Sequence, residues 1–217
     1  MIKVITVERE YGCGAANIAS TIADRLGWKL WDQQLTAEIA KKAEVGEEAV
    51  AMCDERVDSR LYRMAKAFWR GSYERSLPLA DATAFDTDRM MAMMAEISGS
   101  IAAEGNAVIV GRGSPFFLRE REDTYRVFTY ARRDEKIRRL LDLGKSRAEA
   151  EDLVDNVDKE RVAYIKHYFK AEWPTRSLYH TMINTEIGDE KVIDMILHGM
   201  KILEESPAEA ATLRGVR

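Results

Sequence analysis

A glycine-rich turn near the N-terminus has the residue types of a phosphate-binding loop. Residues 9–16 read Arg-Glu-Tyr-Gly-Cys-Gly-Ala-Ala, between a β-branched apolar run and a helical pattern. Glycines let the backbone approach an anion, and the N–H groups of the turn and of the following helix then point at it. The sequence therefore predicts that Gly12, Cys13, Gly14, Ala15 and Ala16 hold phosphate groups through their backbone.

The turn departs from the phosphate-loop pattern of Gly, four residues, Gly-Lys and then Ser or Thr. Gly14 fits the second glycine, but Arg9 stands at the first glycine, Ala15 at the lysine and Ala16 at the hydroxyl that binds Mg²⁺. Inside this turn, Arg9 is the nearest residue whose charge could replace the lysine. Two alternatives stay open: a surface ion pair between Arg9 and a neighbouring glutamate, and a tight turn that needs small residues only for packing.

The cysteines and histidines predict no metal site. Cys13 and Cys53 are too few for a disulfide framework and lack metal-ligand spacing, and His167, His180 and His198 are scattered. A helix N-terminus lowers the pKa of a thiol, so Cys13 could be reactive; a plain small residue is the alternative.

A second glycine-containing turn carries an arginine. Residues 107–110 (Ala-Val-Ile-Val) predict a buried strand, and Gly111-Arg112-Gly113 follows at its carboxyl end. Ligands of open α/β sheets bind at this edge, and a guanidinium there can bind a phosphate group bidentately. A structural arginine seldom needs a glycine on each side, so we predict that Arg112 contacts a ligand.

Three further charged residues are candidates with strong alternatives. Asp32 ends a short apolar run at 28–31, on the same edge of the expected sheet, and could instead cap a helix over 35–43. Asp158 and Arg161 fall near one face of a long charged helix. Such a helix is usually a solvated surface with many ion pairs, which is the alternative for both residues.

Strand and helix patterns alternate along the chain, which is typical of an α/β fold with a mainly parallel sheet. Strands are predicted at 2–7, 28–31, 107–110, 125–131 and 182–185. Helices are predicted at 16–26, 35–43, 47–68, 86–103, 134–169 with a break at 144–146, and 192–203, with a loop at 70–86. The methionines at 90, 91, 93 and 94 indicate either adaptable core packing or a partner-binding groove.

Composition excludes several classes of protein. The chain has 217 residues, 46% of them apolar, with 13 glycines and 4 prolines, which argues against disorder. The 37 acidic and 33 basic residues give a net charge of −4, which disfavours binding to nucleic acid polymers. The longest stretch without a charged residue, 11–23, is too short for a membrane span, and no secretory signal is visible. We therefore expect a soluble cytoplasmic protein.

Taken together, the motifs resemble the cytidylate kinase-like family. Residues 7–14 (Val-Glu-Arg-Glu-Tyr-Gly-Cys-Gly), followed by Ile18-Ala19, look like the opening of that family. Similar segments follow in the same order at 30–32, 106–113, 157–161 and 179–185, so the resemblance reaches about residue 200. It implies a three-layer P-loop nucleoside monophosphate kinase fold in one domain of residues 1–203.

The resemblance also implies a division of that domain. The core would comprise residues 1–31, 105–140 and 180–203, and the mainly parallel sheet would lie in it. Residues 32–104 would be an inserted helical acceptor-binding region that covers one end of the sheet. Residues 141–179 would form a helical lid, and 204–217 a C-terminal tail.

The activity implied is phosphoryl transfer from ATP, with Mg²⁺, to CMP or dCMP. The resemblance implies four catalytic residues, with Asp158, Arg161 and Arg139 in the lid role and Arg9 acting from the turn. Asp32 and Arg112 would bind the acceptor. The expected partners are nucleotides, without nucleic acid polymer or membrane, and a homodimer is compatible with the sequence.

Three departures from the family pattern bear on activity: Ala15, Ala16, and His180 in place of the usual Asp. They leave two alternatives beside the cytidylate kinase hypothesis. One is a non-catalytic nucleotide- or anion-binding regulatory module on the same fold. The other is a kinase for a different small phosphate acceptor.

Overall fold

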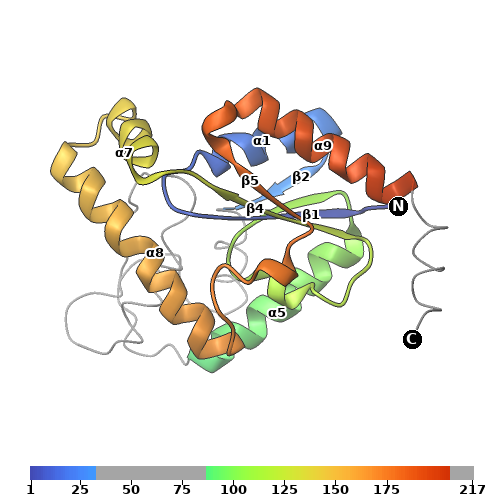
Figure 1. Ribbon diagram of the computed structural model, residues 1–217. Helices are drawn as coiled ribbons and strands as arrows, with labels where there is room; N and C mark the ends of the chain where they lie inside the picture. Colours follow the sequence, from blue (N-terminus) through green and yellow to red (C-terminus); the bar gives the residue numbers. More distant parts are fainter. Residues whose placement is uncertain (33–86, 206–217) are drawn as a thin grey trace.

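The computed structural model describes residues 1–32 and 87–205. The predicted helices at 35–43 and 47–68, the loop at 70–86, Cys53 and residues 206–217 lie outside the described residues. In the described parts, helices cover both faces of one five-stranded sheet, which confirms the three-layer α/β architecture (Figure 1).

The strands are short, and the two central strands β1 and β3 are buried along their whole length. They lie in the order β2-β3-β1-β4-β5, and all four pairings are parallel. Parallel strands buried on both faces read as continuous apolar runs, and the runs in this sequence have that character. The bounds are β1 Val4–Arg9, β2 Lys29–Trp31, β3 Ala107–Val110, β4 Thr124–Tyr130 and β5 Thr181–Asn184.

Two helices cover one face of the sheet, α1 (Ala15–Leu26) and α9 (Asp189–Glu205). Their apolar stripes pack on alternate side chains of the strands, such as Ile5 and Val127. Gly27, directly after the helix predicted at 16–26, ends α1 in the left-handed conformation. Because α1 starts directly after the glycine turn, this packing holds the turn at the carboxyl edge of the sheet.

The opposite face is covered by α5 (Thr87–Glu104), the short α6 (Ser114–Phe117) and the second half of α8 (Arg147–Phe169). Met93 and Met94 are buried in this layer, so the expectation of core packing is confirmed for them. The sequence pattern grouped 87–104 with a region covering one end of the sheet. The structure instead places α5 on a face, since its apolar side chains pack against β3 residues such as Ala107 and Ile109.

Helix α7 (Arg133–Asp142) and the first half of α8 form an antiparallel pair beside the glycine turn (Figure 1). The predicted break is confirmed: Gly144 adopts φ +86, and Ser146 caps α8 by accepting a hydrogen bond from the Glu149 N–H. Two short 3-10 helices, Arg176–Leu178 and Thr185–Ile187, flank β5. No described helix has both the length and the apolar character of a membrane span.

The first strand runs two residues further than the sequence predicted. Its end was placed at Val7, but pairing with β4 continues through Glu8 and Arg9. Both charged side chains are buried, and they face each other with Arg9 Nη1 3.5 Å from Glu8 Oε1. Arg9 is therefore the last residue of a central strand rather than a residue inside the turn.

Candidate functional site

The glycine turn has the backbone geometry of an anion cradle. Gly12 and Gly14 adopt φ +78 and +85, and Gly14 is the N-cap of α1. A Cβ at Gly12 would lie 3.2 Å from Cβ of Lys136, and a Cβ at Gly14 would overlap the Arg139 guanidinium. The left-handed backbone favours glycine at both positions, and the close neighbours leave little room for a side chain. Residues 12–16 therefore have the backbone conformation that the predicted phosphate cradle needs, a glycine turn at the start of a helix.

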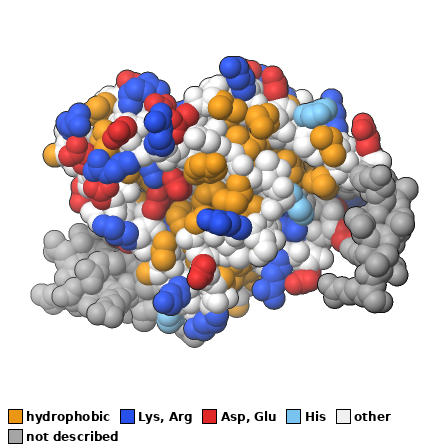
Figure 2. All heavy atoms as spheres, in the orientation of Figure 1, with side chains coloured by type: hydrophobic (Ala, Val, Ile, Leu, Met, Phe, Trp, Pro, Cys, Tyr) orange, Lys and Arg blue, Asp and Glu red, His pale blue; other side chains and the backbone are white. Residues whose placement is uncertain are grey.

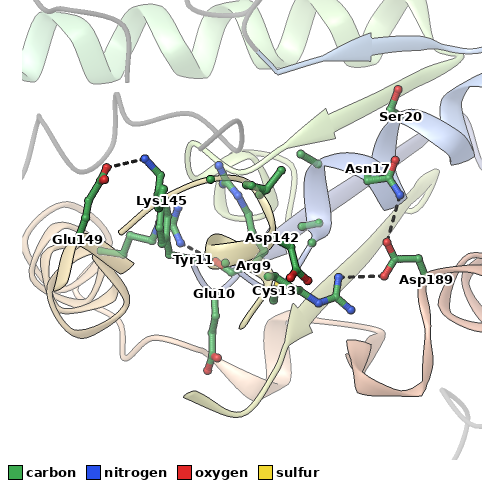
Figure 3. A pocket seen from close by; sticks show the side chains of 18 residues that line it. Arg9, Glu10, Tyr11, Cys13, Asn17, Ser20, Asp142, Lys145, Glu149 and Asp189 are labelled. Carbon is green, nitrogen blue, oxygen red and sulfur yellow. Dashed lines mark hydrogen bonds and ion pairs between the residues drawn. The ribbon is translucent and has the colours of Figure 1, made fainter. Parts of the chain in front are cut away.

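A cavity of about 920 Å³ opens over this turn (Figure 3). All five predicted cradle residues line it, and so do the predicted Arg9, Arg139 and Arg161. Its far wall is the connection between α7 and α8, which includes Asp142, Gly144 and Lys145. The volume is in the range of ordinary small-ligand sites.

Cys13 is buried beneath the turn rather than presented to the cavity as a nucleophile. Its Sγ lies 3.4 Å from Oγ1 of Thr129, and its carbonyl accepts a hydrogen bond from the Thr185 hydroxyl at 2.8 Å. Burial raises the pKa of the Cys13 thiol, and this outweighs the hydrogen bond from Thr129, which acts in the opposite direction. The suggestion that a helix N-terminus activates Cys13 is therefore wrong, and the alternative of a plain small residue fits.

Because the pKa of Cys13 is raised, its thiolate fraction at pH 8 is lower than that of a free cysteine. In a Cys53→Ser background, we expect iodoacetamide to label Cys13 about 10-fold more slowly, or slower still, in the folded protein than in urea, because the thiol is buried. Mass spectrometry after timed quenching measures both rates. Equal labelling rates in the two states would contradict this burial argument.

The guanidinium of Arg9 turns toward the second glycine turn. It packs on Gly111 so closely that any side chain there would overlap it, and its surroundings are buried. Burial lowers the pKa of Arg9, and the charge of Arg161 lowers it further, while Glu8 opposes both. The surface ion pair offered as an alternative is thus an internal one, formed with Glu8 alone.

Helix α8 is hydrogen-bonded directly to the glycine turn. Asp158 Oδ1 accepts from the Tyr11 N–H at 2.9 Å, and Arg161 Nη1 donates to the Arg9 carbonyl at 3.0 Å. The two side chains also pair with each other at 2.9 Å. The alternative interpretation of this helix as a solvated charged surface does not hold for Asp158 and Arg161. They meet the backbone of the turn from 147 or more positions away in the sequence.

The solvated-helix description does fit the outer surface of the α7–α8 pair. There basic and acidic side chains alternate over the helices (Figure 2). Arg133 pairs with Asp155, and Arg138 pairs with Glu135 and Asp142, all at least partly exposed. Exposed pairs of this kind contribute little to stability, up to about 1 kcal/mol each.

Sequence reasoning missed Lys136, which joins this network from α7. Its Nζ lies 2.9 Å from Glu10 Oε2 and 3.4 Å from Asp158 Oδ2, and the side chain is mostly buried. One signal was available: Lys136 shares the buried face of α7 with Ile137 and Leu140. A lysine on an apolar helix face needs a partner, and here the partners flank the turn.

Arg139 lies on α7, the helix that follows β4, and its guanidinium is beside Gly14. Its three nitrogens are all engaged: Nε with Glu135, Nη1 with Asp189 and Nη2 with the Thr185 carbonyl. These bonds fix the guanidinium at the edge of the cavity, next to the start of α1. Its position suits contact with a ligand lying over the turn.

Arg112 and Asp32 lie together at the carboxyl ends of β3 and β2. Both are buried, and the Asp32 charge raises the pKa of Arg112 while burial, Arg9 and Arg161 lower it, for a net value of about 10. Neither carboxylate oxygen of Asp32 has a hydrogen-bond partner in the described parts of the chain. Because a buried carboxylate needs hydrogen-bond donors, Asp32 is suited to a ligand that supplies them.

The backbone around Arg112 is unusual. Gly111, Arg112 and Gly113 adopt φ of +65, +58 and +72 in succession. Left-handed backbone at a residue with a side chain costs on the order of 1 kcal/mol and is concentrated at functional sites. The two glycines make this arrangement possible, and Gly113 additionally leaves room for the Phe169 ring.

A second, small space of about 20 Å³ lies on the Arg112 side of the site, lined also by Glu8, Gly113 and Tyr164. Arg9 and Arg161 line this space and the large cavity alike. Two guanidinium groups thus stand where the phosphate cradle meets the Arg112 turn. The arrangement can bind anionic groups from both sides and stabilise charge that develops between them.

The described residues fit the phosphates of a nucleotide but not a protein-held Mg²⁺. Ala16 has no hydroxyl, and the described chain contains no cluster of three residues able to bind a metal ion. The four carboxylates that line the cavity are each paired with a basic side chain: Glu10 with Lys136, Asp142 with Arg138, Glu149 with Lys145 and Asp189 with Arg139. His180 lies at the opposite, amino edge of the sheet, where it accepts a hydrogen bond from the Arg126 N–H.

Comparison with known proteins supports the reading of the fold. The model of the cytidylate kinase-like family matches residues 4–187. A crystal structure of an uncharacterized protein from Eubacterium ventriosum superposes with a TM-score of 0.66 at 18% identity, covering 93% of this chain and 99% of that one. Shikimate kinase from Acinetobacter baumannii in complex with shikimate gives a TM-score of 0.51 at 15% identity, covering 95% and 96%.

No curated protein matches the sequence. The family match nevertheless spans most of the chain, and it includes the glycine turn, the Arg112 turn and helix α8. The structural neighbours add the fold of a P-loop kinase. The chain therefore belongs to the cytidylate kinase-like family.

Proposed function

We propose that the protein is a small-molecule kinase that transfers a phosphoryl group from ATP to a nucleoside monophosphate, with CMP or dCMP as the first acceptors to test. One observation carries this proposal: Arg9 and Arg161 line both the cavity over the glycine turn and the space beside Arg112. Phosphoryl transfer needs in-line positioning and positive charge between donor and acceptor. Two arginines shared by two adjoining anion sites supply both.

In this proposal the first glycine turn binds the phosphate donor and the Gly111-Arg112-Gly113 turn binds the acceptor. The backbone N–H groups of residues 12–16 hold the donor phosphates, and Mg²⁺ arrives bound to the nucleotide. Arg112 binds the acceptor phosphate. The oxygens of Asp32, which have no hydrogen-bond partner among the described residues, accept hydrogen bonds from hydroxyl or amino groups of the acceptor. Arg9 and Arg161 stabilise the charge on the phosphoryl group in transit.

A coupled assay with ATP, Mg²⁺ and a panel of nucleoside monophosphates tests the proposal. We expect turnover with at least one member of the panel, and a loss of about 10- to 100-fold in kcat/KM for the acceptor in Arg112→Ala, the size of one lost charge-assisted contact. Arg112→Lys, which keeps the charge, should recover part of it. Turnover unaffected by Arg112→Ala would contradict the acceptor assignment.

A second function, a nucleotide-binding module without catalysis, is favoured by one feature. Ala15 and Ala16 replace the two polar side chains that act on phosphate and Mg²⁺ in the phosphate-loop pattern. This function predicts ATP binding in calorimetry and no turnover with any acceptor. Including hydroxyl acceptors such as shikimate in the panel separates it from a kinase with another acceptor.

A further inference from the structure

We infer that Lys145, in the connection between α7 and α8, is the cation that contacts the donor phosphates. It would take the part of the phosphate-loop lysine, whose position in this chain is occupied by Ala15. This inference rests on the proposed function for the identity of the donor. The sequence marks Gly144-Lys145-Ser146 only as a helix break, and neither the family match nor the structural neighbours assign it a role.

The burial of Lys145 differs from that of its neighbours. Residues 141–149 are exposed except Lys145, whose side chain is only 13% exposed. Lysine ordinarily extends into water from a loop of this kind. Here the side chain is largely buried and lines the cavity over the glycine turn, with its Nζ directed at Glu149 (Figure 3).

The backbone of Lys145 is held on both sides, so its position is preset. Its N–H donates to the Leu140 carbonyl at 3.1 Å, and the preceding Gly144 N–H donates to Leu141 at 2.9 Å, which completes the end of α7. Ser146 then caps the start of α8. A cation carried on a fixed backbone loses less entropy on binding a ligand than one on a mobile loop.

The cations that line the cavity differ in how firmly their side chains are held, and Lys145 is held least. Arg139 has partners on all three nitrogens, Arg9 is packed on Gly111, and Arg161 is bonded to the Arg9 carbonyl and Asp158. Among residues 1–32 and 87–205, Lys145 Nζ has one hydrogen bond, at 2.6 Å, to the carboxylate of Glu149, which is about half exposed. An exposed carboxylate can turn to solvent, which leaves the ammonium group for a phosphate.

Calorimetry with ATP and with inorganic tripolyphosphate as probes tests this assignment. We expect Lys145→Met to weaken the binding of both probes by about 10- to 100-fold. Lys145→Arg, which keeps the charge, should stay within about 5-fold of the wild type. The tripolyphosphate arm isolates the phosphate contact from any contact to the base or the ribose.

The matched control is Arg147→Met. Arg147 pairs with Glu151 at the same i,i+4 spacing as Lys145 with Glu149, but it is 74% exposed and does not line the cavity. We expect its probe affinities to stay within about 2-fold of the wild type, since an exposed pair is worth little. Urea unfolding of both variants checks that they are equally folded.

The outcomes separate this inference from the proposed function. Wild-type affinity for tripolyphosphate in Lys145→Met would overturn the inference even if the protein is an active kinase. A selective loss of affinity in Lys145→Met, in a protein that turns over no acceptor, would support the inference and contradict the kinase proposal. Equal losses in Lys145→Met and Arg147→Met would reduce the effect to general surface charge and also overturn it.

Discussion

Replacing Gly111 by alanine is expected to lower kcat/KM by about 100-fold or more while the protein stays folded. A Cβ at this position would overlap Nη1 of Arg9, the far end of a flexible side chain. The clash is therefore relieved by moving the Arg9 guanidinium, which costs little stability. This movement takes Arg9, one of the two arginines that line both spaces, out of its position in the site. Steady-state kinetics with ATP and the best acceptor of the panel measure the effect.

Gly27→Ala is the matched control for this variant. Gly27 has φ +66, nearly the same as the +65 of Gly111, but nothing lies within 4 Å of a Cβ built there. Both variants should lose about 1–2 kcal/mol of unfolding free energy from left-handed strain. Only Gly111→Ala displaces Arg9. Equal activity in the two variants would show that the position of Arg9 does not matter for transfer.

Replacing Arg161 by methionine is expected to have the largest kinetic effect, about 10³-fold in kcat, as for arginines that stabilise a transferring phosphoryl group. Arg161 lines both spaces, and its Nη1 bridges the Arg9 carbonyl and Asp158. Asp158 keeps the Tyr11 N–H and Lys136 as partners in this variant, so it is not left as an unpaired buried charge. We therefore expect the fold to survive.

Arg133→Met controls for the loss of an arginine–aspartate pair on the same helices. Arg133 bonds Asp155 at 2.7 Å, with both side chains about half exposed and away from the cavity. Its kcat should stay within about 2-fold of the wild type. Comparing the tripolyphosphate affinity of Arg161→Met with its kcat separates two roles, because a loss confined to kcat means the contact forms in the transition state. A wild-type kcat in Arg161→Met would remove Arg161 from the mechanism.

The basic residues of the protein fall into two groups, those in exposed ion pairs and a few buried arginines. The chain carries −4 overall, and three basic residues of α7 and α8, Arg133, Arg138 and Arg147, form exposed ion pairs. The buried Arg9, Arg112 and Arg161 differ from these, since burial weakens solvent screening and strengthens their action on a nearby phosphate. A mildly acidic protein can thus hold a small polyanion in one place.

Local sequence patterns were sufficient to predict the sheet and both turns. Strand, glycine turn and helix at the N-terminus follow from β-branched runs, helical spacing and glycines at positive φ. The turn at 111–113 follows from a strand that ends in Gly-Arg-Gly. These features depend on neighbours a few residues apart, and side-chain type encodes them directly.

The contacts that complete the site could not be predicted in this way. Asp158 bonds the N–H of Tyr11, and Arg9 turns to Gly111 because β1 continues to the edge of β3. Lys136 and Lys145 approach the turn only because α7 and α8 pack beside it. A periodicity shows which face of a helix is buried, but not what it is buried against.

The sequence by itself therefore determined the α/β class, the parallel sheet, the glycine turn at residues 12–16 and the arginine between two glycines. Only the tertiary structure decided that Cys13 is buried with a raised pKa, that Arg9 lines both spaces, and that Lys145 lines the cavity over the glycine turn. The physical reason is that backbone conformation is set by local sterics. The charge and solvation of a site instead depend on side chains brought together from distant parts of the chain.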